Sequence, residues 1–247
     1  MYTAFASVYD RLMSNVDYPA WAAFYRDLLR LRGVEAGAVC ECACGTGGLT
    51  LPLAKTYDMT GVDSSPDMLC VAQGKARRAG LSIPFVQSDM RDFTLHRPAD
   101  GVLCTCDGVN YLESEEEVTA FFNAAFRALR PGGALIFDVS TPYKLKHLLG
   151  SRFLCEEMED ISYLWRNSFN ARACRVAMNL SIFKRTAGGL YEKITEEQTQ
   201  YGYSQTALKA LLLKAGFTDI AVYGDRTLGA PGTAEKRWHI AATKKET

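Results

Sequence analysis

The sequence has few histidines, three among 247 residues, and no Cys-x-x-Cys pair among its eight cysteines. The histidines are scattered and form no pair at helical spacing, so a structural zinc site lacks its usual ligands. Five cysteines are spaced by two within two short segments, a period that puts each set on one face of a strand. They are Cys40, Cys42 and Cys44, and Cys104 and Cys106. We interpret them as buried thiols that pack as small apolar side chains, with a soft-metal or arsenic site as the alternative.

An excess of either charge is also missing, because Lys and Arg together number 28, as do Asp and Glu. This balance disfavours nucleic acid as a partner, since phosphate backbones attract a basic surface. No apolar run approaches the ~20 residues that cross a bilayer, which disfavours a membrane partner. Residues 1–10 lack the basic and apolar regions of a secretory signal. With 48% hydrophobic residues, the sequence predicts a globular, cytoplasmic protein.

Short apolar runs alternate with amphipathic helical segments over the first three fifths of the chain, a pattern typical of parallel βαβ units. We expect strands at residues 38–43, 59–62, 84–87, 101–106 and 134–139, and helices at 18–31, 49–55, 65–79 and after the capping box of Ser114. The same rhythm returns near the C-terminus, with a helix capped by Ser204 and strands at 218–223 and 237–243. The predicted fold class is α/β, with a doubly wound, mostly parallel sheet.

A different pattern interrupts this rhythm. Three long runs alternate polar and apolar residues, at 161–169, 174–184 and 190–201. Such alternation predicts antiparallel hairpins with one face buried. We therefore expect a core unit made of residues 1–150 and 204–247, and an antiparallel β insertion over residues 151–203.

The most informative segment is VCECACGTGGLT, residues 39–50, in which a strand leads into closely spaced glycines and then a helix. Gly45 and Gly47 let bare backbone approach a ligand, and N–H groups at a helix start favour an anionic group. The carboxylate of Glu41 would repel a pyrophosphate, but it suits a ligand that carries an ammonium beside a carboxylate, such as the methionine part of S-adenosylmethionine. A nicotinamide dinucleotide is the alternative cofactor.

Two further acids follow the next two predicted strands. Asp63 comes 16 residues after Gly47, where a carboxylate can accept hydrogen bonds from both ribose hydroxyls. Asp89 is placed to accept from an adenine amino group, with Met90 packed against the ring. Three acids at three successive strand ends predict a site for a nucleoside cofactor.

Four segments together resemble the class I S-adenosylmethionine-dependent methyltransferases. They are ECACGTG from Glu41, GVDSSPDML from Gly61, QSDMRDF from Gln87 and LRPGGALIFDV from Leu129. The resemblance implies a seven-stranded Rossmann-like sheet that binds S-adenosylmethionine. It implies that Glu41 and the turn from Gly45 to Gly47 hold the methionine moiety, that Asp63 binds the ribose, and that Asp89 and Met90 contact the adenine. Ala43, Ser64 and Thr105 are also expected to bind the cofactor. Glu41 replaces a commoner Asp, and Ala43 replaces a commoner Gly.

The opening ASVYDRLMSNVDYPAW, residues 6–21, and the inserted hairpins are similar to a narrower branch. This branch holds small-molecule N-methyltransferases such as those of amino sugars and glycine. In it an N-terminal segment and a strand insertion close over the donor, which implies that Tyr9 lines the site. Asp10, Asp17 and Tyr18 are expected to have structural or capping roles.

The acceptor side depends on TCDGVNYL, residues 105–112, which follows the fourth predicted strand. Tyr111 is the candidate to orient or deprotonate the acceptor, and Asn110 the candidate to anchor it. The segment lacks the Asn/Asp-Pro-Pro-aromatic pattern of nucleobase methyltransferases, which again disfavours nucleic acid. Asp138 is not followed by Asn, so no metal site is expected after the fifth strand. His239 is expected to be a core residue.

The sequence therefore predicts an enzyme that transfers a methyl group from S-adenosylmethionine to a small-molecule amine or hydroxyl. Two alternatives are a nicotinamide-dependent oxidoreductase and a non-catalytic module that binds S-adenosylmethionine. The insertion is expected to cover the acceptor, and it could also form a contact in a homodimer.

Overall fold

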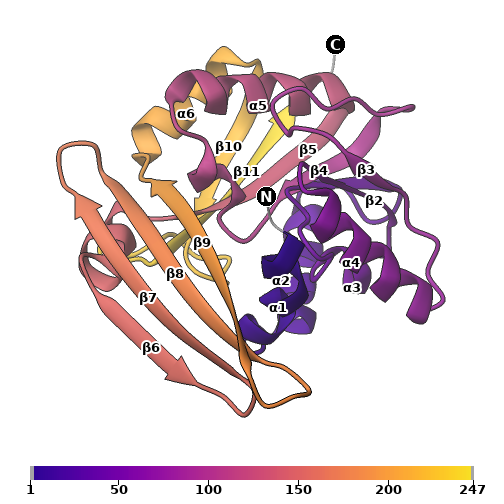
Figure 1. Ribbon diagram of the computed structural model, residues 1–247. Helices are drawn as coiled ribbons and strands as arrows, with labels where there is room; N and C mark the ends of the chain where they lie inside the picture. The colour runs from indigo at the N-terminus through magenta and orange to yellow at the C-terminus, as the bar shows by residue number, and fades with distance from the viewer. Residues whose placement is uncertain (1–2, 246–247) are drawn as a thin grey trace.

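A seven-stranded sheet forms the centre of the computed structural model, which describes residues 3–245 (Figure 1). Its strands are β1 (Ala38–Cys42), β2 (Asp58–Asp63), β3 (Phe85–Gln87), β4 (Ala99–Cys104), β5 (Leu129–Ser140), β10 (Phe217–Tyr223) and β11 (Arg237–Lys244). Their order across the sheet is β10-β11-β5-β4-β1-β2-β3, and β11 runs antiparallel to both of its neighbours. The other neighbouring pairs are parallel. The predicted α/β fold class is confirmed. Residues 1–2 and 246–247 of the expected core unit lie outside the described residues.

Helices cover both faces of this sheet. They are α2 (Tyr18–Leu31), α3 (Thr50–Leu53), α4 (Pro66–Arg78), α5 (Glu115–Ala128) and α6 (Gln205–Lys214). The apolar side chains of α5 and α6 form one core with one sheet face, and those of α2 and α3 form a second core with the other. Cys40, Cys42 and Cys104 lie fully buried in the first core, as expected for thiols that pack as apolar groups.

Short polar side chains start the longer helices, as the sequence predicts. Ser114 Oγ accepts from the backbone N–H of Glu117, and Ser204 Oγ accepts from that of Ala207. Asp17 caps α2 by accepting from the Ala20 N–H at 3.0 Å. Each cap satisfies a backbone donor that the first helical turn leaves free.

Strand β5 begins at Leu129, before the residues 130–133 that the sequence indicates as a turn. Pairing with β4 shifts register between Ala99 and Gly101, which face Leu129 and Ala134. The Pro-Gly-Gly segment is therefore a bulge within a longer strand, because Gly132 adopts a φ of +73° that lets the chain bend without leaving the sheet.

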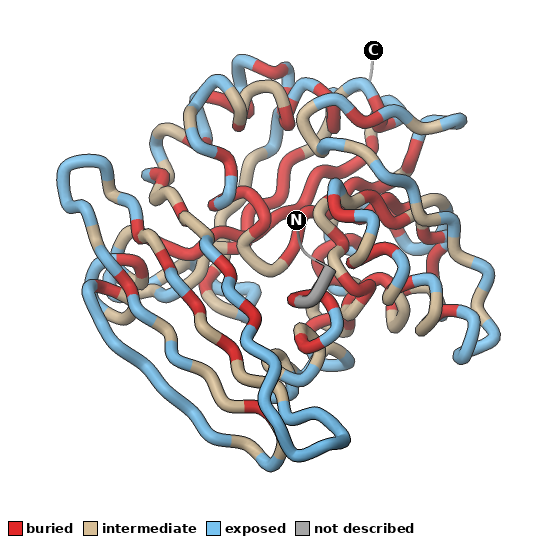
Figure 2. The backbone as a smooth tube through the Cα atoms, in the orientation of Figure 1, coloured by how far each residue is buried: buried red, intermediate tan, exposed pale blue. Residues whose placement is uncertain are grey.

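The insertion forms a separate four-stranded antiparallel sheet. Its strands are β6 (Phe153–Glu157), β7 (Ile161–Asn170), β8 (Arg175–Arg185) and β9 (Tyr191–Tyr201), in that order. The sequence predicts the last three strands but misses β6, whose five residues are all exposed and therefore show no alternation. Figure 2 shows this edge and the hairpin tips as the most exposed part of the sheet.

Two further elements join the sheets. The helix α1 (Thr3–Leu12) contacts α4 on one side and β9 on the other. The short π-helix η2 (Lys144–Leu149) follows β5 and contacts β7 and β8. Phe5, Val8 and Leu145 form a third core with the inner face of the small sheet. The sequence pattern does not predict α1 or η2.

After β1 the chain adds β2 and β3 on one side of it and then returns to place β4 on its other side, so the strand order reverses between β1 and β4. Ligands of open parallel sheets bind in the crevice outside the carboxyl ends of the strands at this point. The glycine-rich turn follows β1, and the 3-10 helix η1 (Gly108–Tyr111) lies a few residues after β4. No helix in the described part of the chain is long and apolar enough to cross a membrane.

Candidate active site

The glycine-rich turn after β1 has a left-handed backbone at Ala43, Gly45 and Gly47, with φ values of +53°, +52° and +73°. A Cβ added at Gly45 would meet nothing within 4 Å, so the glycine leaves open space above the turn. Ala43 adopts a left-handed conformation that glycine reaches more easily, which explains why glycine is the commoner residue at this position. The turn thus presents bare backbone at the carboxyl edge of the sheet.

Asp63, at the end of β2, ties this turn to the next helix. Its Oδ2 accepts from the Gly45 N–H at 2.7 Å, and its Oδ1 accepts from the Ser65 N–H at 2.9 Å. Burial raises the pKa of Asp63, although these backbone hydrogen bonds oppose the rise. A carboxylate has about four acceptor sites, so Asp63 keeps capacity to accept a hydrogen bond from a ligand.

Asp89, after β3, is held by Arg91. The Arg91 Nε lies 2.9 Å from Asp89 Oδ1, and the Arg91 backbone N–H donates to the same oxygen at 2.8 Å. Hydrogen bonds from the Arg91 side chain lower the pKa of Asp89. Asp89 is therefore a fixed anionic acceptor at the edge of the site.

These elements enclose a first cavity of about 380 Å³. Its lining includes eight of the residues expected to bind the cofactor, namely Tyr9, Ala43, Gly45, Asp63, Ser64, Asp89, Met90 and Thr105. The structure thus brings together side chains from α1 and from the ends of β1, β2, β3 and β4.

Glu41 and Gly47, also expected to bind the cofactor, do not line this cavity. Glu41 is 1% exposed, and it accepts hydrogen bonds from Thr50 Oγ1 and, at 2.7 Å, from Thr105 Oγ1. Burial raises the pKa of Glu41 to about 7, against the effect of these hydroxyls. Glu41 therefore lies beneath the site, where it holds the hydroxyl of Thr105. A Cβ at Gly47 would lie 2.8 Å from the Leu51 side chain, so this glycine allows the turn to pack on α3.

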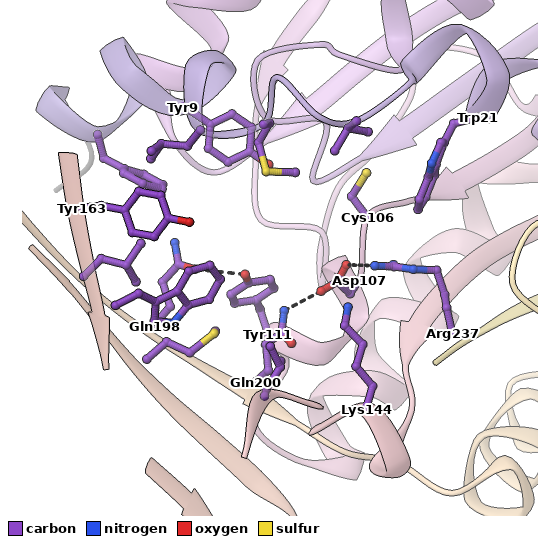
Figure 3. A pocket seen from close by; sticks show the side chains of 18 residues that line it. Tyr9, Trp21, Cys106, Asp107, Tyr111, Lys144, Tyr163, Gln198, Gln200 and Arg237 are labelled. Atoms are coloured by element: carbon purple, nitrogen blue, oxygen red, sulfur yellow. Dashed lines mark hydrogen bonds and ion pairs between the residues drawn. The ribbon is translucent and has the colours of Figure 1, made fainter. Parts of the chain in front are cut away.

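A second cavity, of about 270 Å³, lies between α1, η2 and the inner face of the small sheet (Figure 3). Most of its lining is apolar or aromatic. The apolar and aromatic residues are Phe5, Tyr9, Leu12, Met13, Val16, Trp21, Tyr111, Leu149, Tyr163, Trp165, Met178 and Leu180.

One end of the second cavity is charged. Arg237 Nη2 lies 2.7 Å from Asp107 Oδ1, and Arg237 Nη1 pairs with the fully buried Asp138. Gln200 Nε2 donates to Asp107 Oδ2 at 2.6 Å. Burial by itself would raise the pKa of Asp107, but the charges of Arg237 and Lys144 outweigh it and lower the pKa. Asp107 is therefore held as an ionised carboxylate with a partner on each oxygen.

The two cavities share five lining residues, which we call the junction residues. They are Phe5, Tyr9, Cys106, Tyr111 and Gln198. Tyr111 is 43% exposed and donates from its hydroxyl to Gln198 Oε1 at 3.1 Å. Tyr111 thus lies where a ligand in one cavity can approach a ligand in the other.

Asn110 does not fit the role expected of it. Its side chain is fully buried and lines neither cavity. Its Nδ2 donates to the carbonyls of Ser140 and Tyr201, and its Oδ1 accepts from the Ser140 N–H at 2.8 Å. These bonds fasten η1 to β5 and to the end of β9. The expectation that Asn110 anchors the acceptor is corrected, because its amide is engaged in holding the backbone.

His239 is a core residue, as expected. It is fully buried among the rings of Trp21, Phe24 and Tyr25, and it lines neither cavity. Within residues 3–245, no three His, Cys, Asp or Glu side chains gather as a set that could hold a metal ion.

Sequence reasoning misses the polar residues of the second cavity, namely Asp107, Lys144, Gln198, Gln200 and Arg237. They come from four elements or their ends, so no single motif contains them. One signal is present in β9, where Glu196, Gln198 and Gln200 lie on the same strand face as the buried Ile194. Polar residues on the buried face of a strand indicate a site.

Comparison with known proteins agrees with this geometry. A family model described as a methyltransferase domain matches residues 39–133. A protein of Geobacillus sp. (strain WCH70), a methyltransferase by inference, is 35% identical over 98% of this chain and 99% of its own. The dTDP-3-amino-3,4,6-trideoxy-alpha-D-glucopyranose N,N-dimethyltransferase of Streptomyces venezuelae is 36% identical over 54% of this chain and 56% of its own. A crystal structure of an S-adenosylmethionine-dependent methyltransferase from Clostridium acetobutylicum shares 26% identity and a TM-score of 0.89 over 99% of both chains.

The chain therefore belongs to the S-adenosylmethionine-dependent methyltransferases, and S-adenosylmethionine is its cofactor. The predicted family and enzyme class are confirmed, and an amino-sugar N-methyltransferase is among the relatives, as the resemblance implies. The alternatives of a nicotinamide-dependent oxidoreductase and of a non-catalytic binding module are set aside.

Proposed function

We propose that the protein methylates the nitrogen of a small amine, with the donor in the first cavity and the acceptor in the second. The observation that carries this proposal is the set of five junction residues that line both cavities. Methyl transfer requires the donor carbon and the acceptor atom to be aligned at close range. Two separate cavities that meet at Tyr9, Cys106 and Tyr111 satisfy that requirement.

The first cavity fits the donor. S-adenosylmethionine supplies an electrophilic methyl group on a sulfonium when it is bound. Asp63 keeps acceptor capacity for the ribose hydroxyls, while Asp89 and Met90 offer an acceptor and an apolar contact for adenine. The open turn at Gly45, with Ala43, Ser64 and Thr105, leaves room for the methionine part.

The polar groups of the second cavity favour an amine over a hydroxyl. A neutral amine has a free lone pair, whereas a hydroxyl needs a base to remove its proton. No histidine lines either cavity in the described chain, and Asp107 is a poor base because its ion pair lowers its pKa. The N,N-dimethyltransferase from Streptomyces venezuelae, named for an amino-sugar substrate, supports the same choice.

The small sheet supplies one wall of the proposed acceptor site, through Tyr163, Trp165 and Met178. We therefore propose the division into a core unit of residues 1–150 and 204–247 and an insertion of residues 151–203 that covers the acceptor. The contact of a homodimer through the insertion stays a prediction.

The test uses protein freed of bound donor and measures release of S-adenosylhomocysteine with matched acceptors. The pairs are 2-phenylethylamine with 2-phenylethanol, and glucosamine with glucose. We expect turnover with amines and none with their hydroxyl counterparts, and Tyr111→Phe serves as an impaired control. Turnover confined to the hydroxyl members, or to protein or nucleic acid, would contradict the proposal.

A further inference from the structure

Glu196 is a carboxylate on the largely apolar inner face of the small sheet. It is 6% exposed and lies opposite Leu180 of β8, and the preceding residue on its face, Ile194, belongs to the third core. A buried carboxylate destabilises a fold unless hydrogen bonds compensate the loss of contact with water. Glu196 lines neither cavity, so a ligand in either of them does not supply these bonds. Its partner within the protein therefore indicates its role.

This partner is the amide of Gln198, two residues further along the same strand face. Gln198 Nε2 donates to Glu196 Oε1 at 3.4 Å, which among residues 3–245 is the one hydrogen bond that the carboxylate makes. Burial raises the pKa of Glu196, whereas the hydrogen bond from Gln198 lowers it, so this bond favours the ionised carboxylate. Gln198 is a junction residue, and through it Glu196 reaches the place where the two cavities meet.

The two ends of the Gln198 amide are chemically different, and each end has its own partner. The nitrogen only donates, and it faces the carboxylate of Glu196. The oxygen only accepts, and it faces the Tyr111 hydroxyl at 3.1 Å (Figure 3). The reversed amide would set its oxygen against a carboxylate oxygen without a proton between them. Glu196 therefore fixes the orientation of Gln198, and Gln198 takes the hydroxyl hydrogen of Tyr111.

The direction of this second hydrogen bond matters for methyl transfer to nitrogen. A tyrosine hydroxyl has one hydrogen, and Tyr111 gives it to Gln198. Toward a substrate amine the hydroxyl can then only accept, from an N–H, whereas a hydroxyl that donated to the nitrogen would occupy its lone pair. In the transfer, that lone pair forms the new bond to the methyl carbon, the electrons of the carbon–sulfur bond stay on sulfur, and the positive charge passes to nitrogen.

We propose that Glu196 is a positioning residue for methyl transfer, which acts through Gln198 to hold the Tyr111 hydroxyl as an acceptor for an N–H of the substrate amine. This inference rests on the proposed function, because it requires an amine at the junction. Glu196 lies outside both cavity linings, so it does not take a proton from the amine directly. Its loss should slow the transfer step and leave donor binding unchanged.

The experiment is a double-mutant cycle between Glu196 and Tyr111. Single-turnover rates at saturating donor and amine are measured for wild type, Glu196→Leu, Tyr111→Phe and the double variant. The substrate is the amine that the wild type methylates, 2-phenylethylamine or glucosamine. Leucine suits the apolar surroundings of position 196 and removes the acceptor for Gln198, whereas Glu196→Gln keeps a carbonyl oxygen that can accept. The control is Glu197→Leu, since Glu197 is exposed on the other face of β9.

We expect Glu196→Leu to slow the transfer about fivefold or more, and Glu196→Gln to slow it less. Tyr111→Phe and the double variant should have the same rate, because Glu196 acts through a hydroxyl that both lack. Glu197→Leu should keep the wild-type rate, and donor dissociation constants from calorimetry should be similar throughout. Thermal unfolding shows whether Glu196→Leu is folded, and if it is not, the same cycle with Glu196→Gln decides.

Three results would overturn the inference. A rate of Glu196→Leu within about twofold of wild type would mean that the carboxylate does not position Tyr111. Losses that multiply in the double variant would mean that the two residues act independently. An equal loss in Glu197→Leu would assign the effect to the strand and not to the carboxylate. In each case methylation of an amine by the wild type leaves the proposed function standing, whereas methylation of hydroxyl compounds alone contradicts both.

Discussion

Glu41 is a buried carboxylate and Asp107 a half-buried one, and different neighbours offset the loss of contact with water in the two cases. Glu41 has the neutral hydroxyls of Thr50 and Thr105 as partners, so burial raises its pKa to about 7. Asp107 has the guanidinium of Arg237, which outweighs burial and lowers its pKa. Glu41 therefore titrates near neutral pH, whereas Asp107 stays ionised.

This difference predicts how donor affinity depends on pH. Lowering the pH through about 7 protonates Glu41 and removes the negative charge proposed to attract the donor's ammonium. The dissociation constant of S-adenosylmethionine should then rise by up to about tenfold per pH unit below that value. Glu41→Gln, which is neutral throughout, should bind more weakly and with a flat profile. Calorimetric measurement of the dissociation constant at pH values on both sides of 7 checks this prediction. An equally steep pH dependence in Glu41→Gln would mean that another group causes it.

Tyr111 gives a second prediction at the same scale. Its hydroxyl lies at the junction and is oriented by Gln198, so Tyr111→Phe should slow methyl transfer without changing donor affinity. For an amine, which needs alignment more than proton removal, we expect a loss of about tenfold, below the 10²–10⁴-fold of a general base. Single-turnover rates at saturating acceptor, with donor dissociation constants, provide the measurement. A rate within about twofold of wild type would mean that Tyr111 only packs.

Among the elements, those of the donor side and the strands β7, β8 and β9 of the insertion could be predicted, whereas α1, η2 and the way the insertion packs on the core could not. Parallel strands bring their carboxyl ends to one edge, so Asp63 and Asp89 could be placed from the strand pattern alone. The position of α1 depends on side chains far away in the chain, including Lys75 of α4 and Asp160 before β7. No pattern within the sequence of α1 indicates these contacts. The charged end of the second cavity was missed for the same reason.

The attachment of α1 leads to a prediction about donor release. Asp10 accepts from Thr46 Oγ1 at 2.6 Å and from Lys75 Nζ at 2.8 Å, which fastens α1 to the glycine-rich turn and α4. Asp10→Asn should weaken this contact by about 0.5–1 kcal/mol, because the pair is partly exposed. We expect two- to fivefold faster donor dissociation in stopped-flow experiments. The control is Arg11→Gln, whose more exposed pair with Asp160 should matter less. Equal rates in Asp10→Asn and wild type would show that α1 is held by its apolar face alone.

For the molecule as a whole, a donor in the first cavity would contact residues from all three hydrophobic cores. The first cavity is lined by α1, which packs in the third core, and by strand ends whose side chains belong to the other two. A ligand that contacts all of them stabilises the folded state without a counterpart in the unfolded chain. Cofactor binding should therefore be visible in global unfolding.

We predict that S-adenosylmethionine or S-adenosylhomocysteine at about 100 times its dissociation constant adds roughly 2.7 kcal/mol to the free energy of unfolding. A nicotinamide dinucleotide should add nothing, since the Glu41 carboxylate opposes a pyrophosphate. Asp63→Asn should reduce the shift at equal donor concentration, while Asp67→Asn, in the same segment but outside the cavity lining, should not. Thermal unfolding of ligand-free protein checks this. The absence of a shift with either adenosyl ligand would contradict the assigned donor cavity.

Phe5 and Tyr9, on successive turns of α1, line both cavities. A small movement of this helix would change the surroundings of donor and acceptor together, so we expect their binding free energies to be coupled. Such coupling is reciprocal: if a bound donor raises acceptor affinity by some factor, a bound acceptor raises donor affinity by the same factor. The enzyme would then hold its donor most firmly when an acceptor is present, and it would release S-adenosylhomocysteine more readily once the methylated product has left.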